Sequence, residues 1–356
     1  MDPAYLIPTP DTIPAPWGFF ELLLILTFFC HLVFMNAMLG SAIIALVREI
    51  RTKPTDPPPC QDIASKLPYT IAFAVNFGVA PLLFLQVLYG HFIYTSSILM
   101  GAYWLSVVGL LILAYYSAYL YKMAADLPAT ARKRALATSL LLLLAIAFLF
   151  VNNITLMQTP HIWSVYFHSP DGTFLNLADP TLLPRYLHFV VASVAAGGIF
   201  LAILAFFQQK KGAPEAAKRL STGMKWFTYA TVVEIGTGIP FLFSLPKNVH
   251  RLFVGGSALH TALFVAALVA AVFCLYYGNK ERVWPTTAAM AITVLFMVLV
   301  RDLARQAYLA RYFHPADLQL VPQWSPMLLF VAILVIGVAV VIYMLRLAAR
   351  VPEEVR

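Results

Sequence analysis

Nine long apolar runs separated by short polar segments make up the hydrophobic pattern of this chain. Runs such as 19–47 and 327–345 are near or above the roughly 20 apolar residues that a helix needs to cross a bilayer. The pattern predicts membrane-spanning helices at about 17–47, 67–94, 98–121, 135–157, 184–207, 222–245, 251–277, 284–308 and 326–347. We therefore expect an all-α integral membrane protein, a bundle of about nine transmembrane helices that forms one domain over residues 1–356.

The composition excludes an ordinary soluble domain. The chain is 61% hydrophobic and only 11% charged, whereas soluble domains have about one quarter charged residues. The first apolar run is too long for a cleaved signal peptide, and no Lys or Arg precedes residue 48. It is therefore expected to stay in the protein as its first membrane span.

The formal net charge of +8 has an uneven distribution along the chain. If the N-terminus lies outside, 18 of the 24 Lys and Arg residues fall in the inner segments 48–66, 122–134, 208–225, 278–282 and 346–356. This asymmetry follows the positive-inside rule and predicts an outer N-terminus and a cytoplasmic C-terminus. It accounts for the basic charge without a nucleic-acid partner.

Four histidines lie inside or at the edges of the apolar runs: His31, His91, His188 and His260. An imidazole in hydrocarbon is costly and tends to mark a functional site. Several of them on separate helices favour haem or metal bound between the helices of a bundle. The plainer alternative is that each histidine only hydrogen-bonds across helices. The spacing places His260 about nine residues into its span, and no C-x-x-C-H motif for covalent haem is present.

Other polar residues at the outer ends of the spans are candidates for the same site. Asp302 and Arg305 are one turn apart, so they could form a simple intrahelical ion pair or take part in a site. Glu234 stands among helix-breaking residues. It could be a functional carboxyl that contacts a proton or a quinone, or a structural polar group. His250 is ambiguous at the mouth of the seventh span. The long outer connection 158–183 is aromatic and is expected to pack on the membrane surface or a partner.

Six segments of the chain resemble the large, haem-bearing subunit of the cytochrome bd quinol oxidases. They are 31–40, 76–78 with Gly90, 152–160, 179–193, 251–255 and 302–308, in the order of that family. The resemblance implies nine spans, a bacterial or archaeal cytoplasmic membrane and non-covalent b-type haems. It implies that His31 binds a high-spin haem and His188 a low-spin haem. Asp302 stands where the family has a glutamate that binds haem iron.

The chain also departs from that family at functional positions. Phe253 takes the place of the methionine ligand of the low-spin haem, so His250 or His260 would have to replace it. Gln86 stands where that family has the glutamate that serves its oxygen-reducing haem. Val107 lies near the position of the glutamate of the family's proton path. The long outer quinol-binding loop between spans six and seven is missing. Since glutamine cannot titrate, these changes favour a relative that has lost oxygen reduction and kept electron transfer.

Three functions remain open from the sequence. The first is a b-type haem cytochrome that transfers electrons between the quinone pool and a periplasmic redox partner such as a cytochrome c. The second is a divergent bd-type quinol:oxygen oxidoreductase, and the third is a haem-free, quinone-binding membrane anchor. On the first hypothesis the protein holds two or three haems and is accompanied by a second membrane subunit.

The first hypothesis gives each candidate residue a role. His31 and His188 would bind separate haems, with His91 and His260 as further ligands. Asp302 and Arg305 would bind iron, a haem propionate or a quinone head. The remaining candidates, for a quinol site beside the short connection between spans six and seven, are Glu234, Lys247 and Arg251.

Overall fold

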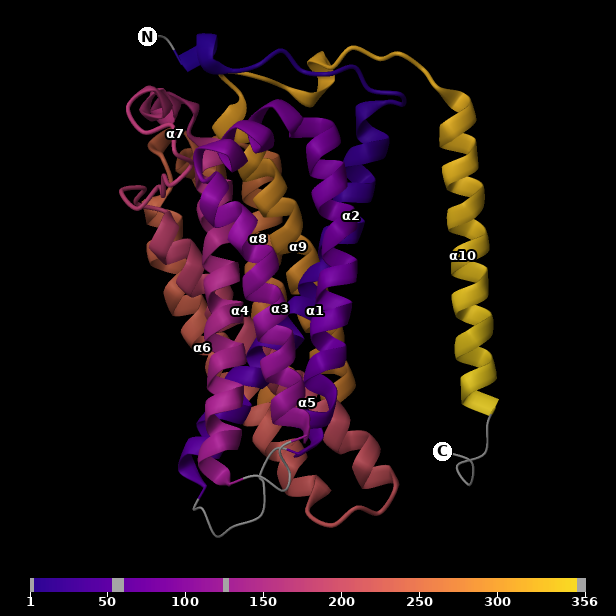
Figure 1. The fold of residues 1–356 in the computed structure, drawn as a ribbon. Helices are drawn as coiled ribbons and strands as arrows, with labels where there is room; N and C mark the ends of the chain where they lie inside the picture. Colours follow the sequence, from indigo (N-terminus) through magenta and orange to yellow (C-terminus); the bar gives the residue numbers. More distant parts are fainter. Residues whose placement is uncertain (1–2, 53–60, 124–127, 351–356) are drawn as a thin grey trace.

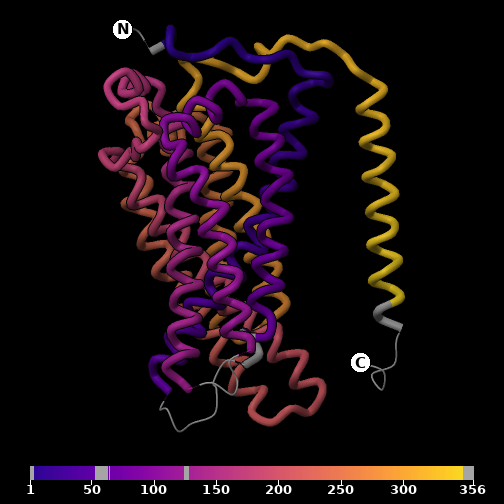
Figure 2. Tube along the Cα trace, in the orientation of Figure 1, coloured from indigo at the N-terminus to yellow at the C-terminus, as the bar shows by residue number. Residues whose placement is uncertain are grey.

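The fold is an all-helical bundle, seen here in a computed structural model that describes residues 3–52, 61–123 and 128–350 (Figures 1 and 2). Its long helices are α1 (Trp17–Arg51), α2 (Gln61–Leu99), α3 (Gly101–Met123), α4 (Ala129–Gln158), α5 (Leu182–Lys210), α6 (Ala216–Ser244), α8 (Ala258–Asn279), α9 (Val283–Leu309) and α10 (Trp324–Arg350). The described residues form no β-strand beyond one isolated bridge. The predicted all-α class is therefore confirmed.

Eight of these helices are individually long and apolar enough to cross a membrane. The ninth candidate is α6 together with its continuation, which bends by 119° at a short break. That continuation consists of the short helix α7 (Lys247–Arg251) and a π turn at Leu252–Gly256. The expectation of about nine spans is confirmed, although the seventh span begins at Ala258 and not at 251, because Gly255 has a positive φ of 92° that ends the helix.

The two ends of the bundle differ in character. At one end, which we call the strap end, the segment after the N-terminus pairs with the segment before α10. Ile13 donates its backbone N–H to the Gln319 carbonyl and accepts the backbone N–H of Val321, both at 2.9 Å. The opposite end, which we call the basic end, carries the described parts of the predicted inner segments 48–66, 122–134, 208–225 and 278–282 (Figure 1). Residues 53–60, 124–127 and 351–356 lie outside the described part.

Glycine contacts hold the centre of the bundle together. A Cβ atom on Gly40 of α1 would lie 1.6 Å from the Ser193 carbonyl oxygen of α5, and one on Gly197 would lie 2.3 Å from the Gly40 carbonyl carbon. On its other side α5 meets α6, where a Cβ on Gly198 would lie 2.5 Å from the Phe227 nitrogen. In a membrane, small residues let helix backbones approach closely enough to pack.

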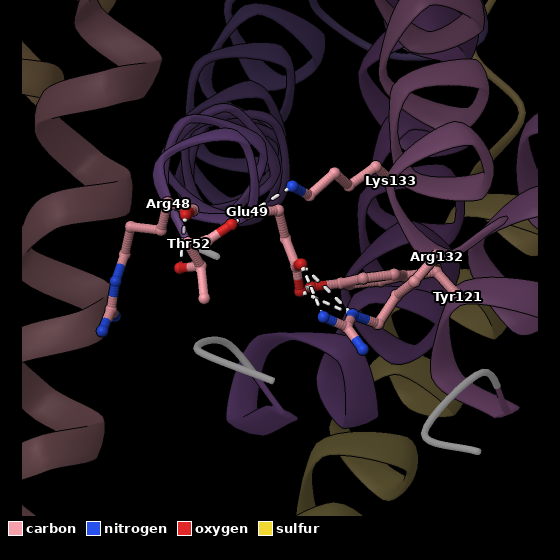
Figure 3. Close-up of polar contacts among 6 residues, drawn as sticks. All are labelled: Arg48, Glu49, Thr52, Tyr121, Arg132 and Lys133. Carbon is pink, nitrogen blue, oxygen red and sulfur yellow. Dashed lines mark hydrogen bonds and ion pairs between the residues drawn. The ribbon is translucent and has the colours of Figure 1, made fainter. Parts of the chain in front are cut away.

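A buried ion pair joins three helices at the basic end (Figure 3). Arg132 of α4 donates from Nε to both oxygens of Glu49 of α1 at 3.1 Å, and Tyr121 of α3 donates its hydroxyl at 3.2 Å. Glu49 is fully buried, so the pair is screened little by solvent. Because its hydrogen bonds are satisfied, this pair serves as a structural clamp.

The loop between α4 and α5 packs on its own chain and not only on the surface. Trp163 is buried and donates its indole N–H to the Leu156 carbonyl at 2.9 Å. By contrast, α10 stands apart from the bundle (Figure 1), and its most apolar stretch has no buried residue. It is joined to the rest of the described chain through the strap.

The α1–α5 contact yields a stability prediction. We expect Gly40→Ala to destabilise the protein by more than about 3 kcal/mol, because its methyl group would overlap a backbone atom and force the two helices apart. The apparent melting temperature of the detergent-purified protein measures this. The control is Gly109→Ala on α3, where no atom lies within 4 Å of the added carbon. Equal melting temperatures for both variants would contradict the predicted role of this contact.

Candidate functional site

Most candidate residues lie in the half of the bundle nearer the strap end. His31 lies on α1, His188 on α5, and Asp302 and Arg305 on α9. Each of these helices is held in place by the central packing of α5 against α1 and of α8 against α9. The structure therefore groups these side chains into three neighbouring polar sites within an otherwise apolar bundle.

His31 has a ring orientation fixed by α2. Its Nδ1 lies 2.9 Å from the carbonyl oxygen of Ala74, which can only accept, so Nδ1 carries the proton of the neutral ring. Gly78 leaves room for the imidazole, since a Cβ there would lie 2.9 Å from Cε1 of His31. The lone pair of Nε2 is thus free to bind a metal, and an Nδ1–H bond to a carbonyl is the usual support of a histidine ligand.

His188 is held by α6 in a similar way. The hydroxyl of Thr237 lies 3.4 Å from Nδ1 of His188 and donates its own proton to the Glu234 carbonyl at 3.0 Å. Because a hydroxyl has one proton to donate, it acts as acceptor toward the ring, and Nδ1 of His188 carries the proton. Gly238 and Phe241 complete the wall beside the ring. Nε2 of His188 is therefore also available for coordination.

The two histidines lie at the same level of the bundle. His31 precedes Gly40 by nine residues, and His188 precedes Gly197 by nine residues. Gly40 and Gly197 mark the contact of α1 with α5. Nine helical residues span roughly 14 Å, so each histidine lies about that far from this contact, toward the strap end. Two fixed imidazoles at one depth on packed helices are suited to two cofactors that exchange electrons.

A charged cluster lies between α1 and α9. Arg305 forms an ion pair with Asp302, as the one-turn spacing suggested. Gln306 donates to Oδ2 of Asp302 at 2.8 Å and to Oε1 of Glu21 at 2.5 Å. Glu21, Asp302 and Arg305 are all buried. The side-chain amide of Gln306 thus links the carboxyl group of Asp302 on α9 to that of Glu21 on α1.

Three arginines lie in and beside this cluster, and Asp179 lies within electrostatic reach of one of them, Arg185. The guanidinium of Arg305 lies over the Tyr89 ring at 4.5 Å, and that of Arg301 lies over the Phe28 ring at 4.2 Å. Within the described part of the chain the guanidinium of Arg301 makes no ion pair or side-chain hydrogen bond. Arg185 of α5 is buried and donates to Oε1 of Gln158 at 2.9 Å. Arg301 lies within electrostatic reach of Arg305 and Arg185.

Several buried polar atoms in this region have no hydrogen-bond partner. Within the described part of the chain they are Glu21 Oε2, His91 Nε2, Arg185 Nε and Arg305 Nε. Buried polar groups in native proteins are nearly always paired, and each exception needs an explanation. The unpaired Nε donors of Arg185 and Arg305, with Arg301 nearby, are suited to binding an anionic group.

The other predicted residues are more scattered. His91 packs between Phe92 and Phe313, with ring centroids 4.3 and 4.5 Å away. His260 lies in the first turn of α8, bonded to Ser257 at 2.9 Å, so the predicted depth of nine residues into the span is wrong. The later start of α8 is the reason. His250 stacks on Phe243 at 5.5 Å.

The candidates for the quinol site are only partly brought together. Lys247 and Arg251 are exposed on α7 at the strap end. Glu234 lies one turn before the Thr237 contact of His188, on the α6 face near Cys274 of α8. The described residues contain no contact that joins His188 to His250 or His260.

Sequence reasoning missed Glu21 and Tyr89, and it included Gln306 only as part of the segment 302–308, without a role of its own. The signal for Glu21 was present, since it is the one acidic residue between Asp11 and Glu49 and falls in an apolar span. Tyr89 gave no such signal, and the sequence did not link Gln306 to Glu21, because both contacts depend on which helices pack together. The kink of α2, where Tyr89 has φ −132° and ψ 29°, directs this residue toward α9.

The residues present fit a haem. A haem needs one or two axial protein ligands, which the free Nε2 atoms of His31 and His188 would provide. Its propionates would suit Arg185, Arg301 and Arg305, because a guanidinium matches a carboxylate. The described residues hold no group of three or more His, Cys, Asp or Glu side chains for a bare metal ion.

Comparison with known proteins supports the fold. No family model matches the chain, and no curated protein matches it. Among solved structures, the bd oxidase from Geobacillus thermodenitrificans is similar with a TM-score of 0.66 over 99% of both chains, at 14% sequence identity. The resemblance inferred from the sequence is thus confirmed at the level of the fold.

The charged cluster generates a prediction about Gln306. We expect Gln306→Leu to destabilise the protein by about 1–3 kcal/mol, because it leaves oxygens of both Glu21 and Asp302 buried without this donor. Thermal unfolding in detergent measures the change. Gln319→Leu, which alters an exposed strap residue, is the matched control. If both variants melt alike, the amide does not stabilise the cluster.

Proposed function

We propose that this chain is a b-type haem cytochrome that transfers electrons between membrane quinone and a redox partner at the strap end. The observation that supports it best is the pair His31 and His188. Each ring has Nδ1 engaged by a neighbouring helix and Nε2 free, at one depth of the bundle. The shared fold with a bd oxidase supports the same assignment.

The side chains have distinct tasks in this proposal. A bound haem supplies a centre that gains and loses one electron. The Ala74 carbonyl and the Thr237 hydroxyl orient the two imidazoles and increase their basicity. Arg185, Arg301 and Arg305 hold anionic propionates, while the surrounding apolar side chains exclude water. None of these tasks requires a large movement of the protein.

The absence of two glutamates of the resembling family favours electron transfer over oxygen reduction. Reducing oxygen to water consumes protons, which must reach a buried centre through titratable groups or water. Gln86 and Val107 stand at or near two positions where the resembling family has glutamates. Glutamine retains hydrogen bonding but does not titrate in this range. We therefore assign the chain to electron transfer, with oxygen reactivity as an outcome of the test below.

The quinone and the partners are proposed from the strap end. Lys247 and Arg251 are exposed there on α7 and could receive a quinone head, with Glu234 deeper on α6. A periplasmic cytochrome c is the proposed soluble partner, because the positive-inside rule assigns the basic end to the cytoplasm. The isolated position of α10 supports a second membrane subunit, which would occupy the space between this helix and the bundle.

Haem spectroscopy tests this function. We expect the purified protein to contain at least two b-type haems, with a reduced spectrum that carbon monoxide changes little. His31→Ala and His188→Ala should each lose about one haem per chain, because each removes one axial ligand. The readouts are the Soret absorbance and the pyridine haemochrome stoichiometry.

The control for these variants is His161→Ala, an exposed loop histidine that should leave the haem content unchanged. A protein without a Soret band would refute the cytochrome and favour a quinone-binding anchor. A large shift with carbon monoxide, together with quinol-dependent oxygen uptake, would favour the oxidase.

A second test addresses Thr237. We expect Thr237→Val to raise the midpoint potential of one haem and to weaken its binding by roughly 10–100-fold, since the valine cannot accept the Nδ1 proton of His188. Redox titration and haem retention on dilution measure both effects. Thr222→Val, on an exposed part of the same helix, is the control. An unchanged potential would mean that Thr237 does not tune the ligand.

A further inference from the structure

A cavity at the basic end lies far along the helices from the histidines. Its volume is about 460 Å³, within the range of small-molecule sites. It is formed where α5 ends, α6 begins and the turn between α8 and α9 returns the chain, with walls from Phe206, Gln209, Leu220, Glu281, Arg282 and Trp284. None of these residues contributes to the proposed haem sites.

One wall of the cavity is aromatic and opens to the membrane boundary. The Trp284 ring meets those of Phe206 and Phe207 edge-on, with centroid distances of 5.7 and 6.1 Å. Trp284 is 49% exposed and Phe207 is 48% exposed. Because α5 and α9 are membrane spans that end here, this wall lies at the level where aromatic residues meet lipid headgroups.

The other wall carries positive charge. Arg282 lines the cavity, and within the described part of the chain its guanidinium has no carboxylate partner. The ammonium group of Lys210 lies over the Phe206 ring at 4.9 Å. The opposite charge at the rim, Glu281, is engaged by the Ser221 hydroxyl at 2.6 Å. Arg282 and Glu281 both line the cavity, and Lys210 lies beside it over the Phe206 ring. Two cations and one carboxylate therefore border the cavity, next to an aromatic side that faces lipid.

We propose that this cavity binds the phosphate headgroup of one anionic phospholipid from the leaflet at the basic end. The rim matches a phosphate in charge, and Arg282 can donate two parallel hydrogen bonds to it. The aromatic wall accommodates the first part of the acyl chains, which continue along the exposed faces of α5 and α9. Basic pockets between membrane helices are known to take such headgroups. A quinone carbonyl can accept a hydrogen bond from Arg282 but has no negative charge to match it, so a quinone is one of the competitors in the test below.

The lipid would act as a structural ligand. It would connect the end of α5 to the turn before α9, the two helices that carry His188 and the Asp302–Arg305 pair toward the other end. The proposal does not depend on haem, so its test remains valid whether or not the proposed electron transfer is correct.

Native mass spectrometry of the detergent-purified full chain tests the site. We expect one phosphatidylglycerol per chain to bind at least ten-fold more tightly than phosphatidylcholine. Arg282→Gln should remove that preference, and Arg282→Lys should retain most of it, since it keeps the charge. Arg134→Gln removes an exposed charge at the same end but outside the cavity, and should bind like the unaltered protein. Lys210→Gln provides a second rim variant if Arg282→Gln does not fold.

The competing ligands give the outcomes that overturn the proposal. Displacement of the lipid by millimolar inorganic phosphate or glycerol 3-phosphate would identify a site for soluble anions. Displacement by a short-chain quinone would identify a quinone site. Equal binding of the two phospholipids, or an equal effect of Arg134→Gln and Arg282→Gln, would leave only non-specific attraction to the basic end.

Discussion

The close contact of α5 with both α1 and α6 is the constraint on which the rest of the structure depends. Gly40 meets Gly197 on one side of α5, and Gly198 meets Gly223 and Phe227 on the other. In lipid, helices gain little from burying apolar surface, so tight packing of small residues and interhelical hydrogen bonds must hold them. These contacts fix the relative depth of α1 and α5, and with it the shared level of His31 and His188.

Two charged clusters at opposite ends of the bundle differ in how completely their buried polar atoms are paired. At the basic end, Glu49 receives hydrogen bonds from Arg132 and Tyr121, so the buried charges are paired and satisfied. Toward the strap end, Arg185, Arg305 and Glu21 keep unpaired buried atoms. Burial of unpaired polar atoms is costly, so they persist where a ligand or a function compensates for the cost.

The break between α6 and α8 separates this chain from a simple nine-helix bundle. Gly255, with its positive φ, stops the helix and lets α7 fold back at the strap end. The break moves His260 to the first turn of α8, and it leaves Phe253 buried beside His260 with ring centroids 5.2 Å apart.

The sequence by itself determined the number of spans, the helical class and the uneven distribution of charge, because each depends on the local run of apolar and basic residues. It also indicated His31, His188 and the Asp302–Arg305 pair, since a polar side chain in an apolar span is conspicuous wherever it packs. Only the tertiary structure decided which helices meet. It joined Glu21 to the Asp302–Arg305 pair through the amide of Gln306, and it placed Thr237 beside Nδ1 of His188. It also placed His260 in the first turn of α8. Those outcomes depend on the glycine contacts between helices and on the positive φ of Gly255. No local pattern of hydrophobicity encodes them.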